Sequence, residues 1–274
     1  MTSGSARPRY FVQALSRGLA LLEVFDEHRR ELTLSELARA LDTNKPTARR
    51  LAQTLVDLGY LTNGPGKRFR LGPRALDLGR RYLAAQDLPD AARPILQALS
   101  EATGESSNLA IRDGREVVYL VRIPAAPRIL SVNLQVGSRL PLHATSLGKA
   151  LLADVAESDL TAILGESPWP ACTERTRRSP QALWPDLLNL RTYGYAVSDE
   201  ELEPGLRSIA APVRNADGAV VASVNLSTHA ARVPLDRLLG PLAEALLAAR
   251  DRLDARLGYV PEQPSLANPL PHRS

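Results

Sequence analysis

Residues 33–70 read TLSELARALDTNKPTARRLAQTLVDLGYLTNGPGKRFR, and this stretch decides the fold of the first part of the chain. Thr33 is followed three residues later by Glu36, which forms a capping box and predicts a helix beginning at Leu34. The apolar residues that then recur at helical spacing are Leu34, Leu37, Ala38 and Leu41. The stretch therefore opens with a short amphipathic helix.

A second helix is expected after a short turn at Asp42 and Thr43. Asn44 is a good N-cap and Pro46 suits a first helical turn, which predicts a helix over residues 44–58 that Gly59 ends. Two short apolar-containing runs then flank Asn-Gly-Pro-Gly at residues 63–66, which predicts a β-hairpin. A helix, a turn, a basic helix and a hairpin in this order are typical of a winged helix-turn-helix.

The charge of residues 44–70 indicates a polyanionic partner. The segment has six basic residues and a single acid, Asp57, whereas the whole chain has a net charge of only +4. The alternative interpretation is a merely solvated basic surface, but the caps, the turn spacing and the basic hairpin occur together, which favours DNA. The residues predicted to contact double-stranded DNA are Asn44, Lys45, Thr47, Arg49, Arg50, Gln53, Thr54, Lys67, Arg68 and Arg70.

Length and composition set the frame for the rest of the chain. The 274 residues have room for two domains, and a hydrophobic content of 44% supports ordinary globular cores. The single cysteine, Cys172, excludes an intramolecular disulfide framework. We expect a cytoplasmic protein, because neither a signal peptide nor a long apolar run is present, and the pI of about 9.4 fits nucleic-acid binding.

The pattern along the chain predicts an α+β protein with two domains. The segments are a flexible tail (1–9), a winged helix-turn-helix (10–72), a linker helix (73–88), a second domain (89–258) and a disordered Pro-rich tail (259–274). A stripe of Leu15, Leu19 and Leu22 predicts a first helix packed beneath the helix pair. On the linker helix we expect Leu76, Leu83 and Tyr82 on the packed side.

Alternating periods in the second domain predict an antiparallel sheet flanked by helices. The predicted helices are 94–103, 146–153, 158–164, 180–193 and 235–257. The predicted strands are 107–112, 117–123, 129–134, 195–198, 208–213 and 220–226. Asp113-Gly114 is a strong hairpin signal between the first two of these strands.

No catalytic motif stands out in the second domain. The Gly148-Lys149 pair lacks the other residues of a P-loop, and Ala144 stands where a nucleophile elbow around Ser146 needs glycine. The four histidines show no metal-ligand spacing, so neither a metal nor a cofactor is expected. An enzyme fused to a DNA-binding domain and a DNA-architectural protein without a ligand stay open as alternatives to a ligand-binding regulator.

The segment GSRLPLHATSLGK, residues 137–149, is the better candidate for binding. It combines an arginine, a histidine and hydroxyls with the start of a helix, where free backbone N–H groups can hold a carboxylate. Arg139 could add a bidentate contact to such a group, or it could instead pair with the acids at residues 199–203. His143 fits a hydrogen-bonded structural histidine better than a ligand contact.

Five segments together resemble the IclR family of bacterial transcriptional regulators, and the likeness extends from about Tyr10 to Leu257. The segments are LSRGLALLEVF, LTLSELARALDTNKPTARRLAQTLVDLGYL, GSRLPLHATSLGKALLA, GYAVSDEELEPGLRSIAAPVRN and VVASVNLS. The resemblance implies a winged helix-turn-helix, a linker helix and a GAF-like effector domain. It also implies a homodimer, often paired into a tetramer, on pseudo-palindromic operators, with RNA polymerase as a further partner if the protein activates transcription.

The resemblance further implies an effector pocket between the sheet and the loops over it. The matching positions are Ser146, Leu147, Ser198, Asp199, Leu206, Ser208, Asn225 and Ser227, beside Arg139 and His143. Ser146-Leu147 replaces the Gly-Ala of some relatives, which implies a bulkier and differently polar pocket floor. The chain looks most like the branch that regulates aromatic-acid catabolism. Protocatechuate, 4-hydroxybenzoate or β-ketoadipate is therefore the expected effector, and a short keto acid is the alternative.

Overall fold

The computed structural model describes residues 8–26, 28–85, 87–125 and 134–260. The chain divides into two compact units, residues 1–85 and 86–274, and the division falls inside the range predicted for the linker. Most of both predicted tails and most of the predicted strand 129–134 lie outside the described residues. Within the described ranges, no helix is both long and apolar enough to cross a membrane.

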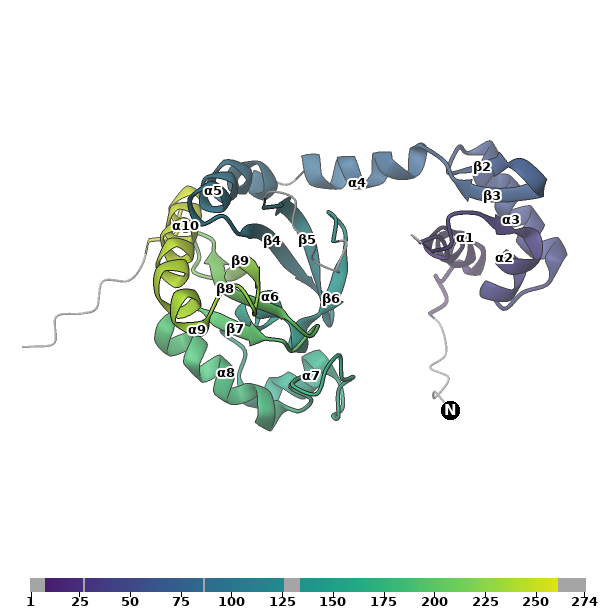
Figure 1. Cartoon of the computed structure of the whole chain (residues 1–274). Helices are drawn as coiled ribbons and strands as arrows, with labels where there is room; N and C mark the ends of the chain where they lie inside the picture. Colours follow the sequence, from purple (N-terminus) through teal and green to yellow (C-terminus); the bar gives the residue numbers. More distant parts are fainter. Residues whose placement is uncertain (1–7, 27, 86, 126–133, 261–274) are drawn as a thin grey trace, which may run out of the picture. The chain divides into compact units, whose positions relative to one another are not determined.

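The first unit is a winged helix-turn-helix followed by one further helix (Figure 1). Its elements are α1 (Gln13–Glu23), β1 (Leu32–Thr33), α2 (Leu34–Ala40), α3 (Lys45–Asp57), β2 (Leu61–Gly64), η1 (Pro65–Lys67), β3 (Arg68–Leu71) and α4 (Arg74–Ala84). The three strands form an antiparallel sheet in the order β1-β3-β2. The two-residue strand β1 was not predicted, because so short a run carries no periodicity.

The predicted helix caps are formed. The Thr33 hydroxyl accepts a hydrogen bond from the Glu36 backbone N–H, and the Glu36 carboxylate accepts one from the Thr33 N–H at 2.7 Å. The Asn44 side chain caps α3 by accepting from the Thr47 N–H at 2.9 Å. Gly59 then adopts a φ of 78°, a left-handed conformation suited to a helix end. These local devices explain why both helices begin and end close to their predicted positions.

The core of this unit is small and built from the helices α1, α2 and α3 and the sheet. Its buried residues are Leu21, Leu32, Leu37, Ala52, Leu55 and Leu61. The predicted stripe on α1 was only partly right, because Leu21 is the buried residue and Leu22 packs against the core, whereas Leu15 and Leu19 are 62% and 52% exposed. The prediction for α4 was wrong for Leu76 and Tyr82, which are 75% and 48% exposed, whereas Leu83 is half-buried. Apolar periodicity shows that a face is apolar, but not what covers it.

The second unit is an α+β domain around one six-stranded antiparallel sheet. Its strands lie in the order β6-β5-β4-β9-β8-β7. They are β4 (Ser106–Asp113), β5 (Glu116–Ile123), β6 (Arg139–Pro141), β7 (Ala196–Asp199), β8 (Leu206–Arg214) and β9 (Val220–His229). The predicted hairpin turn lies between β4 and β5, where Gly114 has a φ of 59°.

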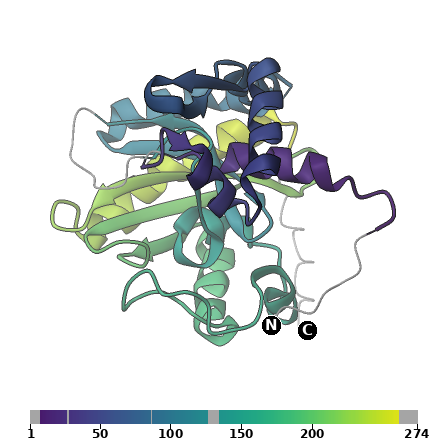
Figure 2. The same ribbon diagram turned by 90° about the vertical axis from the view of Figure 1, so that its right-hand side faces the viewer.

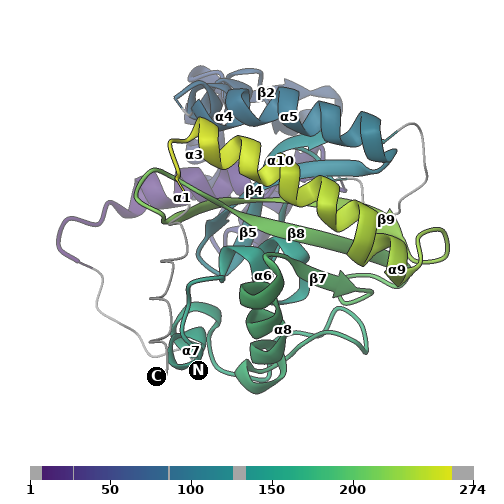
Figure 3. The same cartoon turned by 90° about the vertical axis from the view of Figure 1, so that its left-hand side faces the viewer.

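Helices cover both faces of this sheet. They are α5 (Asp87–Thr103), η2 (Leu142–Ala144), α6 (Ser146–Leu151), η3 (Glu157–Asp159), α7 (Leu160–Leu164), α8 (Pro180–Tyr193), α9 (Leu235–Arg237), η4 (Leu238–Leu242) and α10 (Ala243–Arg256). The helices α5 and α10 pack together along one face, with α10 in front of β8 and β9 in Figure 3 and behind the green strands in Figure 2. The short helix α6 packs against β7, β8 and β9 on the other face.

Two predicted helices are interrupted. The segment 235–257 contains a π-helical stretch, η4, around Gly240 and Pro241, because proline cannot donate the backbone hydrogen bond that a regular helix needs. The segment 158–164 begins as the 3-10 turn η3 and becomes α-helical only at Leu160. The helix predicted from Pro94 begins earlier, at Asp87, and contains Pro94.

The face of the sheet under α6 is polar where the strands come together. Strand register places Asn108 opposite Asn225, and Ser227 opposite both Ser106 and Ser208. Paired residues share a face of the sheet, so these amides and hydroxyls lie together beneath α6. Away from this area the same side is apolar, with Leu142, Leu147, Leu152 and Trp169 among its buried residues. The fold thus forms a polar hollow beside an apolar core.

Candidate DNA-binding surface and effector pocket

The exposed side of α3 is a candidate nucleic-acid surface. Ala48, Ala52 and Leu55 are buried against the rest of the first unit, so the side chains between them point outward. Lys45, Arg49 and Arg50 are exposed, and within the described ranges no carboxylate forms an ion pair with them. A row of unpaired cations on a helix of this motif is suited to phosphates and base edges.

Three other predicted contacts on α3 are already engaged within the helix. Asn44 is used as the cap, the Gln53 amide donates to Asp57 at 2.9 Å, and the Thr54 hydroxyl donates to the Arg50 carbonyl at 2.8 Å. Thr47 is half-buried. These residues are within the predicted surface, and their side chains keep hydrogen-bonding groups for a partner, such as the Asn44 amide N–H groups and the Gln53 carbonyl.

The wing contains three cations in different settings. Arg68 donates to the Glu31 carbonyl and lies 3.8 Å from the Glu36 carboxylate, and Arg70 lies 3.8 Å from Glu31. Lys67 stands in the turn between β2 and β3 with a φ of 59°, and its side chain is exposed. The tip of the wing therefore offers Lys67 to a partner, whereas the two arginines also hold the wing against the start of α2.

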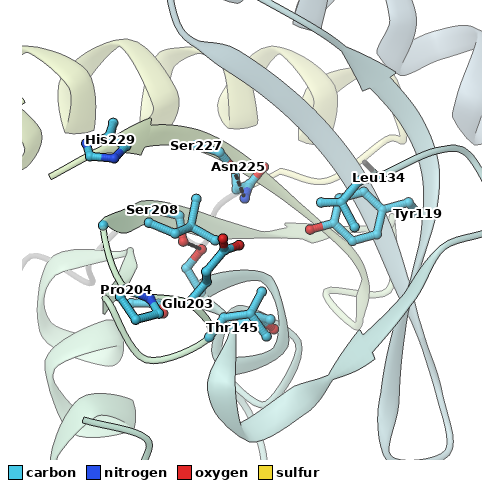
Figure 4. Close-up of a pocket in the computed structure, with 14 residues that line it drawn as sticks. Tyr119, Leu134, Thr145, Glu203, Pro204, Ser208, Asn225, Ser227 and His229 are labelled. Atoms are coloured by element: carbon cyan, nitrogen blue, oxygen red, sulfur yellow. Dashed lines mark hydrogen bonds between the residues drawn. The ribbon is translucent and has the colours of Figure 1, made fainter. Parts of the chain in front are cut away.

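The second unit contains a pocket between the sheet, α6 and the β7–β8 loop (Figure 4). The residues that line it are Tyr119, Leu134, Thr145, Ser146, Ser198, Leu202, Glu203, Pro204, Gly205, Leu206, Ser208, Asn225, Ser227 and His229. They come from β5, the segment before β6, the start of α6, β7, the loop after β7, β8 and β9. Hydroxyls and amides dominate its polar surface, and no lysine or arginine is among the described lining residues.

Hydrogen bonds connect the hydroxyls and amides of the pocket wall. The hydroxyls of Ser146 and Ser208 are 2.7 Å apart, which joins the start of α6 to β8. The Asn108 amide donates to Asn225 at 2.8 Å, and the Asn225 amide donates to the Ser227 hydroxyl at 3.1 Å. This network fixes the orientation of polar groups before any ligand is bound, which lowers the cost of binding.

Three ionisable side chains complete the polar wall. Figure 4 shows Tyr119 and Glu203 extending toward the hollow from different sides, with His229 at the end of β9. Tyr119 is only 3% exposed, and burial raises the pKa of its phenol, so it stays a neutral hydrogen-bond donor. The wall thus presents one carboxylate and several hydroxyl donors.

The β7–β8 loop has a strained and tightly held backbone. Glu200 has a φ of 62° and Gly205 a φ of 79°, and the Gly205 N–H donates to the Glu200 carboxylate at 2.9 Å. A Cβ at position 205 would lie 2.8 Å from Nε2 of His229. Glycine is therefore favoured here by its conformation, and a Cβ would also displace the His229 ring.

The structure brings six of the ten predicted effector residues to the pocket. These are Ser146, Ser198, Leu206, Ser208, Asn225 and Ser227. Leu147 is instead fully buried in the apolar core, so only the serine of the Ser146-Leu147 pair changes the pocket wall. Asp199 points to arginines, at 2.5 Å from Arg207 and 3.1 Å from Arg175.

The other two predicted residues also lie outside the pocket lining. Arg139 is on the edge strand β6, where it pairs with Asp113 and, at 2.7 Å, with Glu116, rather than with residues 199–203. His143 packs against Trp169, and its Nε2 donates to the Pro170 carbonyl at 2.9 Å. Burial lowers the pKa of His143, as expected for a structural histidine.

Sequence reasoning missed several pocket residues. Tyr119, Glu203 and His229 line the hollow, yet they are distant in sequence and belong to no common motif. The alternation of strand 117–123 could have placed Tyr119 on one face, but only the strand order shows which face carries the pocket. Glu203 follows the consecutive acids of residues 199–201, a pattern that is typical of a solvated turn.

Family models match both units. Residues 14–65 match the IclR helix-turn-helix domain, and residues 80–255 match the C-terminal domain of bacterial transcriptional regulators of the IclR type. The chain belongs to the IclR family of bacterial transcriptional regulators. The family resemblance seen in the sequence and the predicted fold class are thereby confirmed.

Relatives and solved structures of the IclR family extend over nearly the whole chain. The Pca regulon regulatory protein of Pseudomonas putida is 38% identical over 87% of this chain and 82% of its own length. A solved structure from Rhodococcus sp. RHA1 is 43% identical, has a TM-score of 0.79, and matches over 90% of this chain and 98% of its own. An IclR homologue from Microbacterium hydrocarbonoxydans, solved in complex with 4-hydroxybenzoate, is 28% identical with a TM-score of 0.78, over 89% and 99% of the two chains.

IclR membership assigns general roles to the two surfaces. The helix-turn-helix unit binds DNA, and the second unit is the effector-binding domain of a transcriptional regulator.

Proposed function

We propose that this IclR-family regulator binds a small aromatic acid carrying a hydroxyl group, such as 4-hydroxybenzoate or protocatechuate, in the pocket between α6 and the β7–β8 loop. The observation that carries the proposal is the composition of the wall: one carboxylate, Glu203, and hydroxyl donors that include Tyr119. The relative named for the Pca regulon and the neighbour solved with 4-hydroxybenzoate support the same class of ligand.

Hydrogen-bonding type decides how such a ligand would be oriented. A Glu203 carboxylate oxygen can accept a hydrogen bond from a phenolic hydroxyl of the ligand, but it has no hydrogen to donate to a ligand carboxylate. The ligand carboxylate is then placed away from Glu203, where the Tyr119 and serine hydroxyls can donate to it. Both ends of a hydroxybenzoate are thereby matched, while benzoate would leave Glu203 without its ligand donor.

Calorimetric titration with a matched panel tests this ligand class. We expect 4-hydroxybenzoate and protocatechuate to bind more tightly than benzoate by about tenfold, because a hydrogen bond to a charged group contributes about 1.5–3 kcal/mol. β-Ketoadipate and pyruvate represent the non-aromatic acids in the panel. Tighter binding of pyruvate than of any aromatic acid would contradict the proposal and favour a short-keto-acid effector.

DNA binding is proposed to depend on α3 and the wing. In this arrangement α3 enters the major groove with Lys45, Arg49 and Arg50, and Lys67 contacts the backbone or minor groove beside it. Ligand binding in the second unit would shift the population of conformations that fit the operator, by no more than its difference in affinity for them. A duplex selected by the protein from random DNA supplies the probe for gel-shift measurements.

We also propose that the regulator acts as a homodimer whose copies meet through α1. Tyr10, Val12, Leu15 and Leu19 form an exposed apolar surface that a monomer would leave in water. Two copies are what a pseudo-palindromic operator would require. Light scattering after chromatography tests whether α1 forms the dimer interface. Leu15→Glu with Leu19→Glu should give monomers, and an unchanged dimer would show that the copies meet through another surface.

A further inference from the structure

Lys149 is a charged residue buried out of contact with solvent. Its side chain has 0% exposure, and such burial of an ammonium costs several kcal/mol unless close partners compensate it. Its Nζ donates to Glu201 at 2.6 Å, to Asp186 at 2.7 Å and to the Val197 carbonyl at 3.0 Å. All three hydrogens of the ammonium group therefore have acceptors within the domain.

The partners of Lys149 belong to the elements that surround the pocket. Lys149 follows Ser146, which lines the pocket, by about one turn of α6. Glu201 belongs to the β7–β8 loop and immediately precedes the lining residues 202–206. Val197 lies on β7 and Asp186 on α8. Lys149 thus joins the helix at one wall of the pocket to the loop at another.

The two carboxylates do not depend on Lys149 equally. Asp186 has a second cation, Arg177, at 3.0 Å, and despite burial these two cations hold its pKa below the ordinary value. Within the described residues Glu201 has an ion pair with Lys149 alone, and its Oε2 is buried without a hydrogen-bond partner. Burial raises the pKa of Glu201 against the opposing effect of Lys149. Removal of the lysine charge would therefore leave Glu201 without its ion pair, whereas Asp186 would keep Arg177.

Other contacts hold the loop at points around Glu201. The Thr173 hydroxyl donates to the Glu200 carbonyl at 2.7 Å, and the Thr176 hydroxyl to the Glu201 carbonyl at 2.7 Å. These contacts reach the loop backbone from the segment before α8. They hold the loop in place but do not connect it to α6, which Lys149 does.

We propose that Lys149 is the positioning residue of the effector pocket: its ion pair with Glu201 holds the β7–β8 loop at the distance from α6 that a ligand requires. This inference rests on the proposed function for the location of the ligand. Loss of the Lys149 charge removes the ion pair that ties the loop to α6, because Glu201 then either takes up a proton or carries its carboxylate into water. Residues 202–206 then lose their fixed position opposite Ser146.

Hydrogen exchange tests the positioning role without any ligand. Lys149→Met keeps the length of the side chain and removes its charge. We expect the amides of Glu200, Gly205 and Leu206, which are hydrogen-bonded within the loop, to exchange at least about tenfold faster. The amides of the β4–β5 hairpin should keep their exchange rates.

Arg191→Met is the matched control for a merely structural loss. Arg191 donates to the Ala153 and Val155 carbonyls at 2.8 and 2.6 Å, beyond the other end of α6, and does not contact the loop. It should lower the melting temperature without selective exchange at the loop. Equal exchange across the domain in both variants, or an unchanged loop in Lys149→Met, would overturn the proposal.

A second variant covers the case in which Lys149→Met does not fold. Glu201→Gln leaves Lys149 paired with Asp186, so the buried ammonium keeps a counter-ion while the loop loses its charge contact. Faster exchange confined to the loop is the expected result, and a loop that exchanges as in the unmodified protein would contradict the positioning role.

Ligand titration completes the test. The affinity for 4-hydroxybenzoate should fall about tenfold in Lys149→Met, and within about twofold it should stay unchanged in Arg191→Met. If the unmodified protein binds no acid of the panel, the proposed ligand class fails, while the exchange measurement still decides whether Lys149 holds the loop. Unchanged affinity beside faster loop exchange would refute the claim that the loop position governs binding.

Discussion

The DNA-binding surface and the effector pocket are built in opposite ways. The first is an exposed row of cations on one helix and one turn, and residues within 44–70 supply all of it. The second is a half-enclosed wall of hydroxyls, amides and one carboxylate taken from β5, α6, β7, the β7–β8 loop, β8 and β9. Contacts on the first surface should be nearly independent of one another, whereas those of the pocket should be coupled.

Loss of the exposed cations of α3 should give the largest effect. We expect Arg49→Ala with Arg50→Ala to weaken gel-shift affinity for the selected duplex by at least about a hundredfold, since each bidentate base contact is worth about 1–3 kcal/mol. The affinity for 4-hydroxybenzoate should stay the same, because the two surfaces belong to separate units. Retained DNA affinity would show that α3 is not the recognition helix.

A single pocket hydroxyl should have a tenfold effect. Tyr119→Phe removes the buried phenol oxygen, and we expect calorimetry to show about tenfold weaker 4-hydroxybenzoate binding, because the ligand carboxylate loses a donor. Arg139→Ala is the matched control, as Arg139 pairs with Asp113 and Glu116 outside the pocket. A larger loss in Arg139→Ala than in Tyr119→Phe would restore the arginine as the carboxylate contact.

The wing should contribute less than the helix. Lys67→Gln is expected to lower DNA affinity by about threefold and to reduce the slope of log affinity against log salt concentration by about one, as for one lost phosphate contact. Arg68→Gln should in addition lower the melting temperature of the first unit, because Arg68 also contacts Glu31 and Glu36. If Lys67→Gln leaves the salt slope unchanged, the tip of the wing does not touch phosphate.

The smallest expected effect is a pH dependence of stability. Burial lowers the pKa of His143 below its ordinary value of 6.5. As the pH falls below 6.5, His143 is therefore protonated in the unfolded chain before it is protonated in the folded chain. Stability should therefore decline in that range, with a slope of at most about 1.4 kcal/mol per pH unit from this group. His143→Gln should flatten the decline in urea titrations, and an unchanged slope would assign it to other groups.

Local signals explain how much of the fold could be predicted. The capping box at Thr33, the Asn44 cap and the Asp113-Gly114 turn act within a few residues, and each element they predict is present. The exposure of Leu15, Leu19 and Leu76 could not be predicted, because periodicity identifies an apolar face without its partner. The π-helical stretch around Gly240 and Pro241 could have been predicted from these two residues, but the apolar periodicity favoured one continuous helix.

The pocket depended on strand order, which no local pattern contains. Ser208, Asn225 and Ser227 were placed through family resemblance, and the antiparallel register shows why they meet. Glu203 and Tyr119 needed the fold itself, since one lies in a loop and the other on β5. Lys149 appeared in the sequence only as half of a failed P-loop motif, whereas its burial beside Glu201 points to a structural role for its charge.

The central claim is that ligand binding in the pocket controls the affinity for DNA. Gel-shift affinity for the selected duplex, measured without and with saturating 4-hydroxybenzoate, tests it most directly. The account predicts a change of at least about fivefold, and the same factor when ligand affinity is measured with and without the duplex. Ligand that binds the pocket and leaves DNA affinity unchanged would contradict it.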